Sequence, residues 1–149
     1  MRRVEADALV GASHDEVWDL YDDIAGEPRW MPGVRAVLYV SGPARVGAVY
    51  RERTSVYGFP GTAQWEIVEH RRPKTQVRES SDAWMQRTLT LTFEGRGTGT
   101  RIHHALELRS RLWGPIGWLH EQLAAAVASA ALRATAAGAK RAFEGEPPR

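Results

Sequence analysis

The stretch Thr88-Leu89-Thr90-Leu91-Thr92-Phe93 decides the fold, because large apolar residues alternate strictly with threonines along it. Successive side chains of a β-strand point to opposite faces of the sheet, so the leucines and Phe93 share one face and the threonines the other. One face of this strand must then be covered, while the other faces solvent. We expect an antiparallel sheet with a covered side, on which Leu91 lies.

Similar short runs extend on both sides of this strand, from Val34 to Arg109. Clusters of turn-forming residues separate the runs, so six strands joined by hairpins are expected in this region. A further alternating run at residues 2–10 predicts one more strand, which gives about seven. The turn clusters lie at residues 41–43, 57–61, 72–74, 80–82 and 94–99.

The covered side of the sheet needs a second layer, and the segment from Pro115 to about Phe143 is expected to supply it. A proline at the first turn and eleven alanines between Ala124 and Ala142 predict one long helix. Trp118 and Leu132 are expected on the face of this helix that points away from the sheet. The face that meets the sheet is expected to be the stripe Ile116, Leu119, Leu123, Val127, Ala130, Ala134 and Ala137.

A segment with apolar residues at helical spacing follows the first strand. Ser13-His14-Asp15-Glu16 forms a capping box, in which the serine hydroxyl takes an amide of the first turn and the glutamate reaches back. Apolar residues follow at helical spacing until Gly26 and Pro28 interrupt the pattern. The sequence therefore predicts a short helix and then a second helical turn near Trp30.

The composition excludes several classes of protein. The 149 residues are 43% hydrophobic and 26% charged, which suits one globular domain over residues 1–143 with a flexible tail at 144–149. Without cysteine there is no disulfide scaffold, thiolate zinc site, iron–sulfur cluster or cysteine nucleophile. A formal net charge of +2 gives little support to nucleic-acid binding. With no signal-type or membrane-spanning apolar run, we expect a cytoplasmic protein without stable membrane insertion.

Four short motifs occur in order along nearly the whole chain: Ser13–Leu20, Trp30–Val34, Trp65–His70 before a proline, and Gly99–Ile102. Together with the order of the elements they resemble the START-like or Bet v 1-like (SRPBCC) superfamily, in its polyketide cyclase/dehydrase and lipid transport branch. The resemblance implies an α+β helix-grip fold, in which a curved antiparallel sheet wraps around a long C-terminal helix. It also implies a cavity, open at one end, for lipids, sterols, plant hormones or polyketide intermediates.

The run Trp65-Glu66-Ile67-Val68-Glu69-His70-Arg71 is similar to a Trp-Glu-aromatic-Val-x-His-Arg run of the aromatase/cyclases. Ile67 stands where those enzymes have an aromatic residue. The resemblance implies that Trp65 and Arg71 line the pocket and position a poly-β-ketone chain.

Several side chains are candidates for lining such a cavity. Tryptophan offers a large apolar area with one directed N–H donor, as ligand cavities often use. Tyr50 and Glu52 share the strand face opposite Arg51 and Arg53, so they face the cavity if the arginines face water. Each candidate also fits a plain role in the core or at the surface. The ligand-binding candidates are Trp30, Tyr50, Trp65, Glu79, Trp84, Leu91, Leu119 and Leu123.

His104 shares the parity of Ile102, Leu106 and Leu108 and should lie on the covered face, whereas His103 should point to solvent. A covered imidazole can act as a general acid or base, or simply be hydrogen-bonded in the core. Because adjacent histidines on a strand diverge, the pair cannot chelate one metal ion. We expect neither a metal site nor a cofactor.

Three functions fit these observations. The first is binding of a hydrophobic small molecule, with no nucleic-acid partner. The second is an enzyme of the cyclase or dehydratase type, in which His104 or Glu52 removes a proton α to a carbonyl and Arg71 or Tyr50 stabilises the enolate. The third is a protein-interaction module that uses the outward Trp118 and Leu132, and a homodimer stays open in each case.

Overall fold

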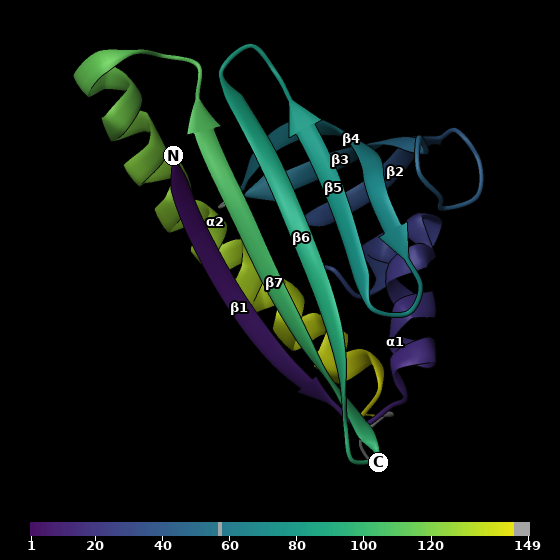
Figure 1. Ribbon diagram of the computed structural model, residues 1–149. Coiled ribbons are helices and arrows are strands. Elements are labelled where there is room, and N and C mark those ends of the chain that lie inside the picture. Colours follow the sequence, from purple (N-terminus) through teal and green to yellow (C-terminus); the bar gives the residue numbers. More distant parts are fainter. Residues whose placement is uncertain (57, 145–149) are drawn as a thin grey trace.

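The computed structural model describes residues 1–56 and 58–144 (Figure 1). Strand β1 (Arg2–Val10) is followed by helix α1 (His14–Asp22) and the 3-10 helix η1 (Ile24–Arg29). The capping box forms as predicted, because the Ser13 hydroxyl accepts the Glu16 N–H at 3.3 Å. The remaining elements are β2 (Val34–Val40), β3 (Val49–Val56), β4 (Phe59–Arg71), β5 (Thr75–Ser81), β6 (Met85–Arg96), β7 (Gly99–Ser110) and α2 (Gly114–Ala142). Tyr57 of the predicted 57–61 turn and residues 145–149 of the predicted tail lie outside the described residues.

The seven strands form one antiparallel sheet in the order β1-β7-β6-β5-β4-β3-β2. Successive strands from β2 to β7 pair as hairpins, while β1 pairs with β7, which places Ala6 opposite His104. The sheet bends strongly, so that β2, β3 and β4 cross behind the other strands in Figure 1. These features confirm the expected helix-grip architecture, with six strands between Val34 and Arg109 plus the N-terminal strand.

The core lies between the covered face of the sheet and the two helices. Leu91 and Phe93 of β6 are buried there, as the alternating stretch predicts, and they pack with Trp18 and Tyr21 of α1. The rings of Trp18 and Phe93 meet edge to face, with 5.3 Å between their centroids. The first helix therefore covers the middle of the sheet beside α2.

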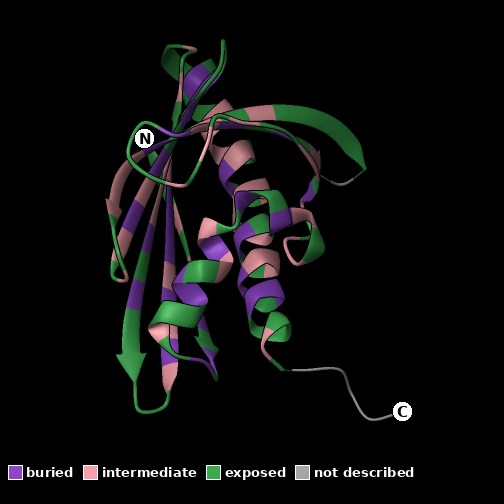
Figure 2. Ribbon diagram, turned by 90° about the vertical axis from the view of Figure 1, so that its right-hand side faces the viewer, coloured by how far each residue is buried: buried purple, intermediate pink, exposed green. Residues whose placement is uncertain are grey.

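Helix α2 packs on β1 and β7 through small residues, and the predicted stripe of large residues is wrong. Ile116, Leu119 and Leu123 are exposed, whereas Leu132, expected to point outward, is buried. Buried and exposed residues alternate along the helix in Figure 2. The buried residues of α2 are Gly117, Ala125, Leu132, Ala136, Gly138 and Ala139.

Close backbone approach explains this choice of face. A Cβ atom on Gly138 would lie 2.1 Å from the carbonyl oxygen of Trp30, and one on Gly117 would lie 2.1 Å from that of Leu112. Large side chains cannot fit where the helix runs this near to other backbone. No helix among residues 1–56 and 58–144 is both long and apolar enough to cross a membrane.

Candidate functional site

A charged cluster is buried between the covered face of the sheet and η1. Arg78 of β5 and Glu27 of η1 are each only 2% exposed, and Arg78 Nη1 donates to Glu27 Oε1 at 2.9 Å. The same Nη1 donates to the Tyr50 hydroxyl of β3 at 2.8 Å. A buried ion pair of this kind is tolerated only when further hydrogen bonds satisfy both ions.

The other nitrogens of Arg78 supply those bonds. Its Nη2 donates to the carbonyl oxygen of Tyr21 at 2.8 Å, and its Nε donates to Gln76 Oε1 at 2.5 Å. Burial alone would lower the pKa of Arg78, but Tyr50 and Glu27 raise it above its ordinary value. Arg78 is therefore a fixed cation that joins β5, β3, α1 and η1.

Glu52 of β3 lies beside this cluster as a second buried carboxyl group. Burial, and after it the negative charge of Glu27, raise the pKa of Glu52 to about 9 against the lowering effect of Arg78. Within the described part of the chain, Glu27 Oε2 and Glu52 Oε2 have no hydrogen-bond partner. At neutral pH the site thus holds a protonated carboxyl group, a carboxylate and a guanidinium side by side, which is a set able to donate and accept protons.

The raised pKa of Glu52 gives a pH dependence with a definite sign. Glu52 holds its proton in the folded state up to about pH 9, whereas the unfolded chain loses it near 4.5. Folding therefore takes up a proton between these values, and the contribution of Glu52 to stability falls as pH rises. We expect Glu52→Gln to remove this loss. The free energy of unfolding of the variant, relative to that of the wild type, should therefore rise from pH 4.5 to pH 9. Urea denaturation at several pH values measures the difference, and a constant difference would contradict the assignment.

His104 lies on the covered face, as predicted, and both of its ring nitrogens are engaged inside the protein. Its Nδ1 is 3.0 Å from the carbonyl oxygen of Ala6, which can only accept, so Nδ1 carries the proton. Nε2 then accepts the hydroxyl of Tyr21 at 2.6 Å. Burial lowers the pKa of His104 to about 4, so the ring is neutral. In this conformation no nitrogen of His104 is free to meet a substrate.

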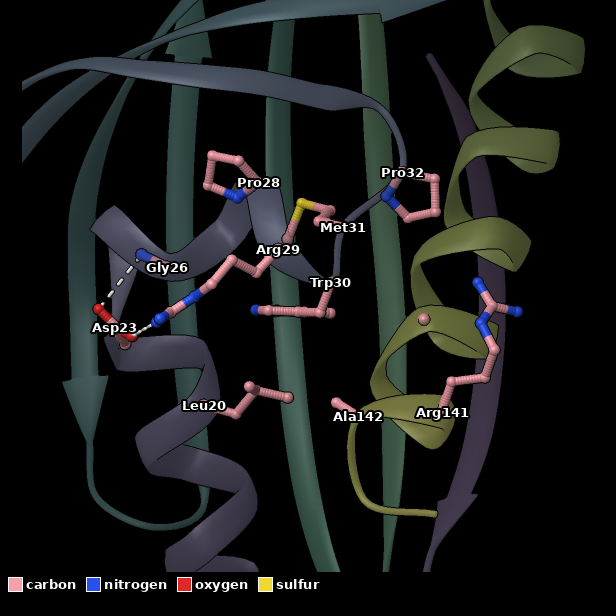
Figure 3. A pocket seen from close by; sticks show the side chains of 11 residues that line it. Leu20, Asp23, Gly26, Pro28, Arg29, Trp30, Met31, Pro32, Arg141 and Ala142 are labelled. Atoms are coloured by element: carbon pink, nitrogen blue, oxygen red, sulfur yellow. Dashed lines mark hydrogen bonds and ion pairs between the residues drawn. The ribbon is translucent and has the colours of Figure 1, made fainter. Parts of the chain in front are cut away.

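A pocket of about 490 Å³ opens between η1 and the C-terminal end of α2 (Figure 3). The indole of Trp30 crosses its middle, with Leu20 and Ala142 below the ring and Met31 above it in this view. The Trp30 ring also lies 4.9 Å from the ring of Tyr21, centroid to centroid, and so connects the pocket to the buried interior. The lining is Leu20, Asp23, Gly26, Pro28, Arg29, Trp30, Met31, Pro32, Gly138, Arg141 and Ala142.

Trp30 is the one predicted ligand-binding residue that lines this pocket. Its Nε1 is buried and has no hydrogen-bond partner within residues 1–56 and 58–144. A buried indole N–H normally finds an acceptor, so this unsatisfied donor beside the pocket needs a structural explanation.

Tyr50 and Glu52 lie on the covered face as predicted, and Trp65 is half-buried against the cluster that contains Met85 and Leu106. Other predicted site residues lie elsewhere. The side chain of Arg71 is 77% exposed and pairs with Glu69 at 2.7 Å, away from the buried cluster. The remaining ligand-binding candidates that the structure places at the surface are Glu79, Trp84, Leu119 and Leu123.

The expectation that Glu79 faces the cavity is wrong. The covered face of β5 carries Gln76, Arg78 and Ser80, all buried, and Glu79 lies on the other face. Sequence reasoning missed Arg78 because apolar residues are expected on the covered face of a strand and charged residues on the other face. The run of polar residues at every second position, Gln76 to Ser80, was the available signal.

These features define a protein of the START-like or Bet v 1-like helix-grip class, with a polar cluster buried under an apolar pocket. The family model for polyketide cyclase/dehydrase and lipid transport matches residues 1–144. The chain belongs to this family. A comparison with curated proteins finds no match.

Solved structures show the same fold. A START superfamily protein from Mycobacterium smegmatis superposes with a TM-score of 0.78 at 14% identity, covering 95% of this chain and 97% of that chain. The aromatase/cyclase Zhui from Streptomyces sp. R1128 gives 0.72 at 17% identity, with 94% of each chain covered. The di-domain ARO/CYC BexL from the BE-7585A biosynthetic pathway gives 0.76 at 22% identity, covering 98% of this chain and 51% of that chain. At these identities the likeness shows a shared fold.

Proposed function

We propose that the protein binds a hydrophobic small molecule, lipid-like, polycyclic or polyketide, in the pocket between η1 and the C-terminal end of α2. The observation that carries the proposal is a largely apolar pocket of about 490 Å³ that Trp30 lines, together with the buried N–H of Trp30, which has no partner among the described residues. Ligand sites commonly combine an apolar wall with a few polar groups that fix orientation. Membership of a polyketide cyclase/dehydrase and lipid transport family supports a ligand of this class.

The buried cluster around Arg78 also supports binding of a ligand, because it lies next to the pocket. The ring of Trp30 packs at a tilt against that of Tyr21, and the carbonyl oxygen of Tyr21 accepts from Arg78. A ligand that moved past Trp30 would meet the protonated Glu52 and the Glu27 carboxylate, which lie beside each other and suit hydroxyl groups on the ligand. The polar selection would then come from these groups and the apolar area from the pocket wall.

Titration with an apolar fluorescent probe tests the role of Trp30. We expect Trp30→Ala to weaken binding of the probe by about tenfold or more, because a buried aromatic side chain contributes about 1.5–3 kcal/mol. Trp118→Ala is the matched control, since Trp118 is exposed and does not line this pocket. Equal affinity of the wild type and Trp30→Ala for the probe would show that this pocket is not the binding site.

A cyclase or dehydratase is the second candidate, favoured by the protonated Glu52 beside the Arg78 cation. In this alternative Glu52 acts as a proton donor and Arg78, which is buried in the cluster, is better placed than the exposed Arg71 to stabilise an enolate. His104 would need to release Tyr21 before it could act as a base.

Turnover of a poly-ketone measured beside binding of an unreactive analogue separates the two candidates. An enzyme requires that Glu52→Gln abolishes turnover while binding of the analogue stays nearly unchanged. Equal loss of turnover and binding, or no turnover by the wild type, would leave ligand binding as the function. The same pair of measurements on His104 and Arg71 variants tests the two remaining catalytic candidates.

A further inference from the structure

Large apolar side chains are exposed at one end of the molecule, away from the pocket at Trp30. We call this end the tryptophan tip and define it as Trp84, Trp113 and Ile116, which are 62%, 89% and 69% exposed. Leu119 and Leu123 continue the exposed apolar surface along the next turns of α2. Single exposed apolar residues are ordinary, but a concentration of them marks a surface that binds something.

The tip is built from two turns held together. Trp84 lies in the β5–β6 turn and Trp113 precedes α2, and the Arg111 N–H donates to the carbonyl oxygen of Trp84 at 2.9 Å. Figure 1 shows the β5–β6 turn and the β7–α2 connection at the same end of the molecule. Trp113 occupies the N-cap position of α2 but makes no side-chain capping bond. Its side chain is exposed, so the indole can contact a partner.

The charges around the tip favour an anionic partner. Asp82 is already paired with Arg87 at 3.0 Å and accepts the N–H groups of Trp84 and Met85. Arg111 is bonded to the carbonyl oxygen of Asp82 at 2.7 Å, and Arg109 lies opposite Gln86 at the same end of the sheet. Arg109 and Arg111 have no carboxylate partner within the described ranges. Exposed indoles thus lie at the same end of the molecule as two arginines that form no direct ion pair among the described residues.

We propose that the tryptophan tip docks on the surface of an anionic lipid bilayer. Tryptophan rings prefer the interface between headgroups and acyl chains, and nearby arginines are attracted to anionic headgroups. The apolar side of the first turns of α2 would lie in this interface, as amphipathic helices do when they bind without spanning the membrane. This inference does not depend on which molecule occupies the pocket at Trp30.

Co-sedimentation with vesicles tests the docking. We expect the protein to bind vesicles made of an equal mixture of phosphatidylcholine and phosphatidylglycerol. It should bind vesicles of pure phosphatidylcholine more weakly. Arg109→Gln should weaken binding to the anionic vesicles about fivefold, the effect of one basic residue near such a surface. Arg35→Gln, on the exposed surface of β2 at the other edge of the sheet, is the matched control and should leave binding unchanged.

The tryptophans have their own test. The double variant Trp84→Ala and Trp113→Ala should lose about tenfold or more in vesicle affinity, while Leu9→Ala, exposed near the opposite end of β1, should lose none. In the wild type, phosphatidylcholine brominated on its acyl chains should quench tryptophan emission when mixed with the anionic lipid. Absence of binding to the anionic vesicles, or binding without quenching, would overturn the proposal. So would a dimer in sedimentation that Trp113→Ala dissociates, since a second copy of the chain would then occupy the tip.

Discussion

Replacement of Arg78 by methionine is expected to lower the free energy of unfolding by about 3–5 kcal/mol, the cost of breaking a buried ion pair. The variant leaves Glu27, only 2% exposed, without its cation. It also leaves Tyr50, Gln76 and the carbonyl oxygen of Tyr21 without their donor. Urea denaturation monitored by circular dichroism measures the loss.

Arg71→Met is the matched control for this variant. The side chain of Arg71 is 77% exposed and its pair with Glu69 lies at the surface, so the change should cost less than about 1 kcal/mol. Adding Glu27→Gln to Arg78→Met should restore part of the lost stability, because it removes the uncompensated charge. A cost for Arg78→Met as small as that of Arg71→Met would show that the cluster does not bind the sheet to η1.

Gly138→Ala is expected to destabilise the protein by about 1–3 kcal/mol, the usual cost of overpacking. In most helices the same change stabilises, since glycine is a poor helix former. Here the new Cβ would lie 2.1 Å from the carbonyl oxygen of Trp30, so α2 has to move away from η1. Both residues line the pocket, and we therefore expect probe binding to weaken as well.

Gly11→Ala provides the comparison, because a Cβ at Gly11 would meet no atom within 4 Å. This substitution should leave both the melting temperature and the affinity for the probe unchanged. Thermal unfolding followed by circular dichroism measures both variants. A higher melting temperature for Gly138→Ala than for the wild type would mean that α2 does not approach Trp30 this closely.

Most of the fold could be predicted from local patterns. The alternation from Thr88 to Phe93 gave a strand with its apolar side chains buried, and Ser13 and Glu16 gave the start of α1. These predictions succeed because side-chain direction in a strand and capping at a helix start depend on residues close in sequence. The seven strands followed from the turn clusters for the same reason.

The face of α2 that packs on the sheet could not be predicted in this way. Large apolar residues identify the helix face that is expected to be buried. Leu119 and Leu123 therefore favoured their own face over the face that carries the buried alanines. The structure instead buries Ala125, Ala136 and Gly138, and at Gly138 the carbonyl oxygen of Trp30 comes too close for any side chain. That distance depends on the tertiary arrangement and leaves no trace in helical spacing.

The buried cluster was missed for a different reason. Assigning strand faces assumes that apolar residues face inward, which is wrong for Gln76 and Arg78. Their burial depends on Glu27, 51 residues away from Arg78 in sequence, which supplies the compensating charge. A polar residue can be placed inside only when its partner is known, and here the partner lies on another element.

Native mass spectrometry of the protein purified from the lysate of its own organism tests the central claim most directly. We expect a mass above that of the chain under gentle conditions, from a hydrophobic small molecule that is lost under denaturing conditions. The excess mass should be reduced in Trp30→Ala and retained in Trp118→Ala. A mass equal to that of the chain under both conditions, together with no binding of an apolar fluorescent probe, would contradict the claim.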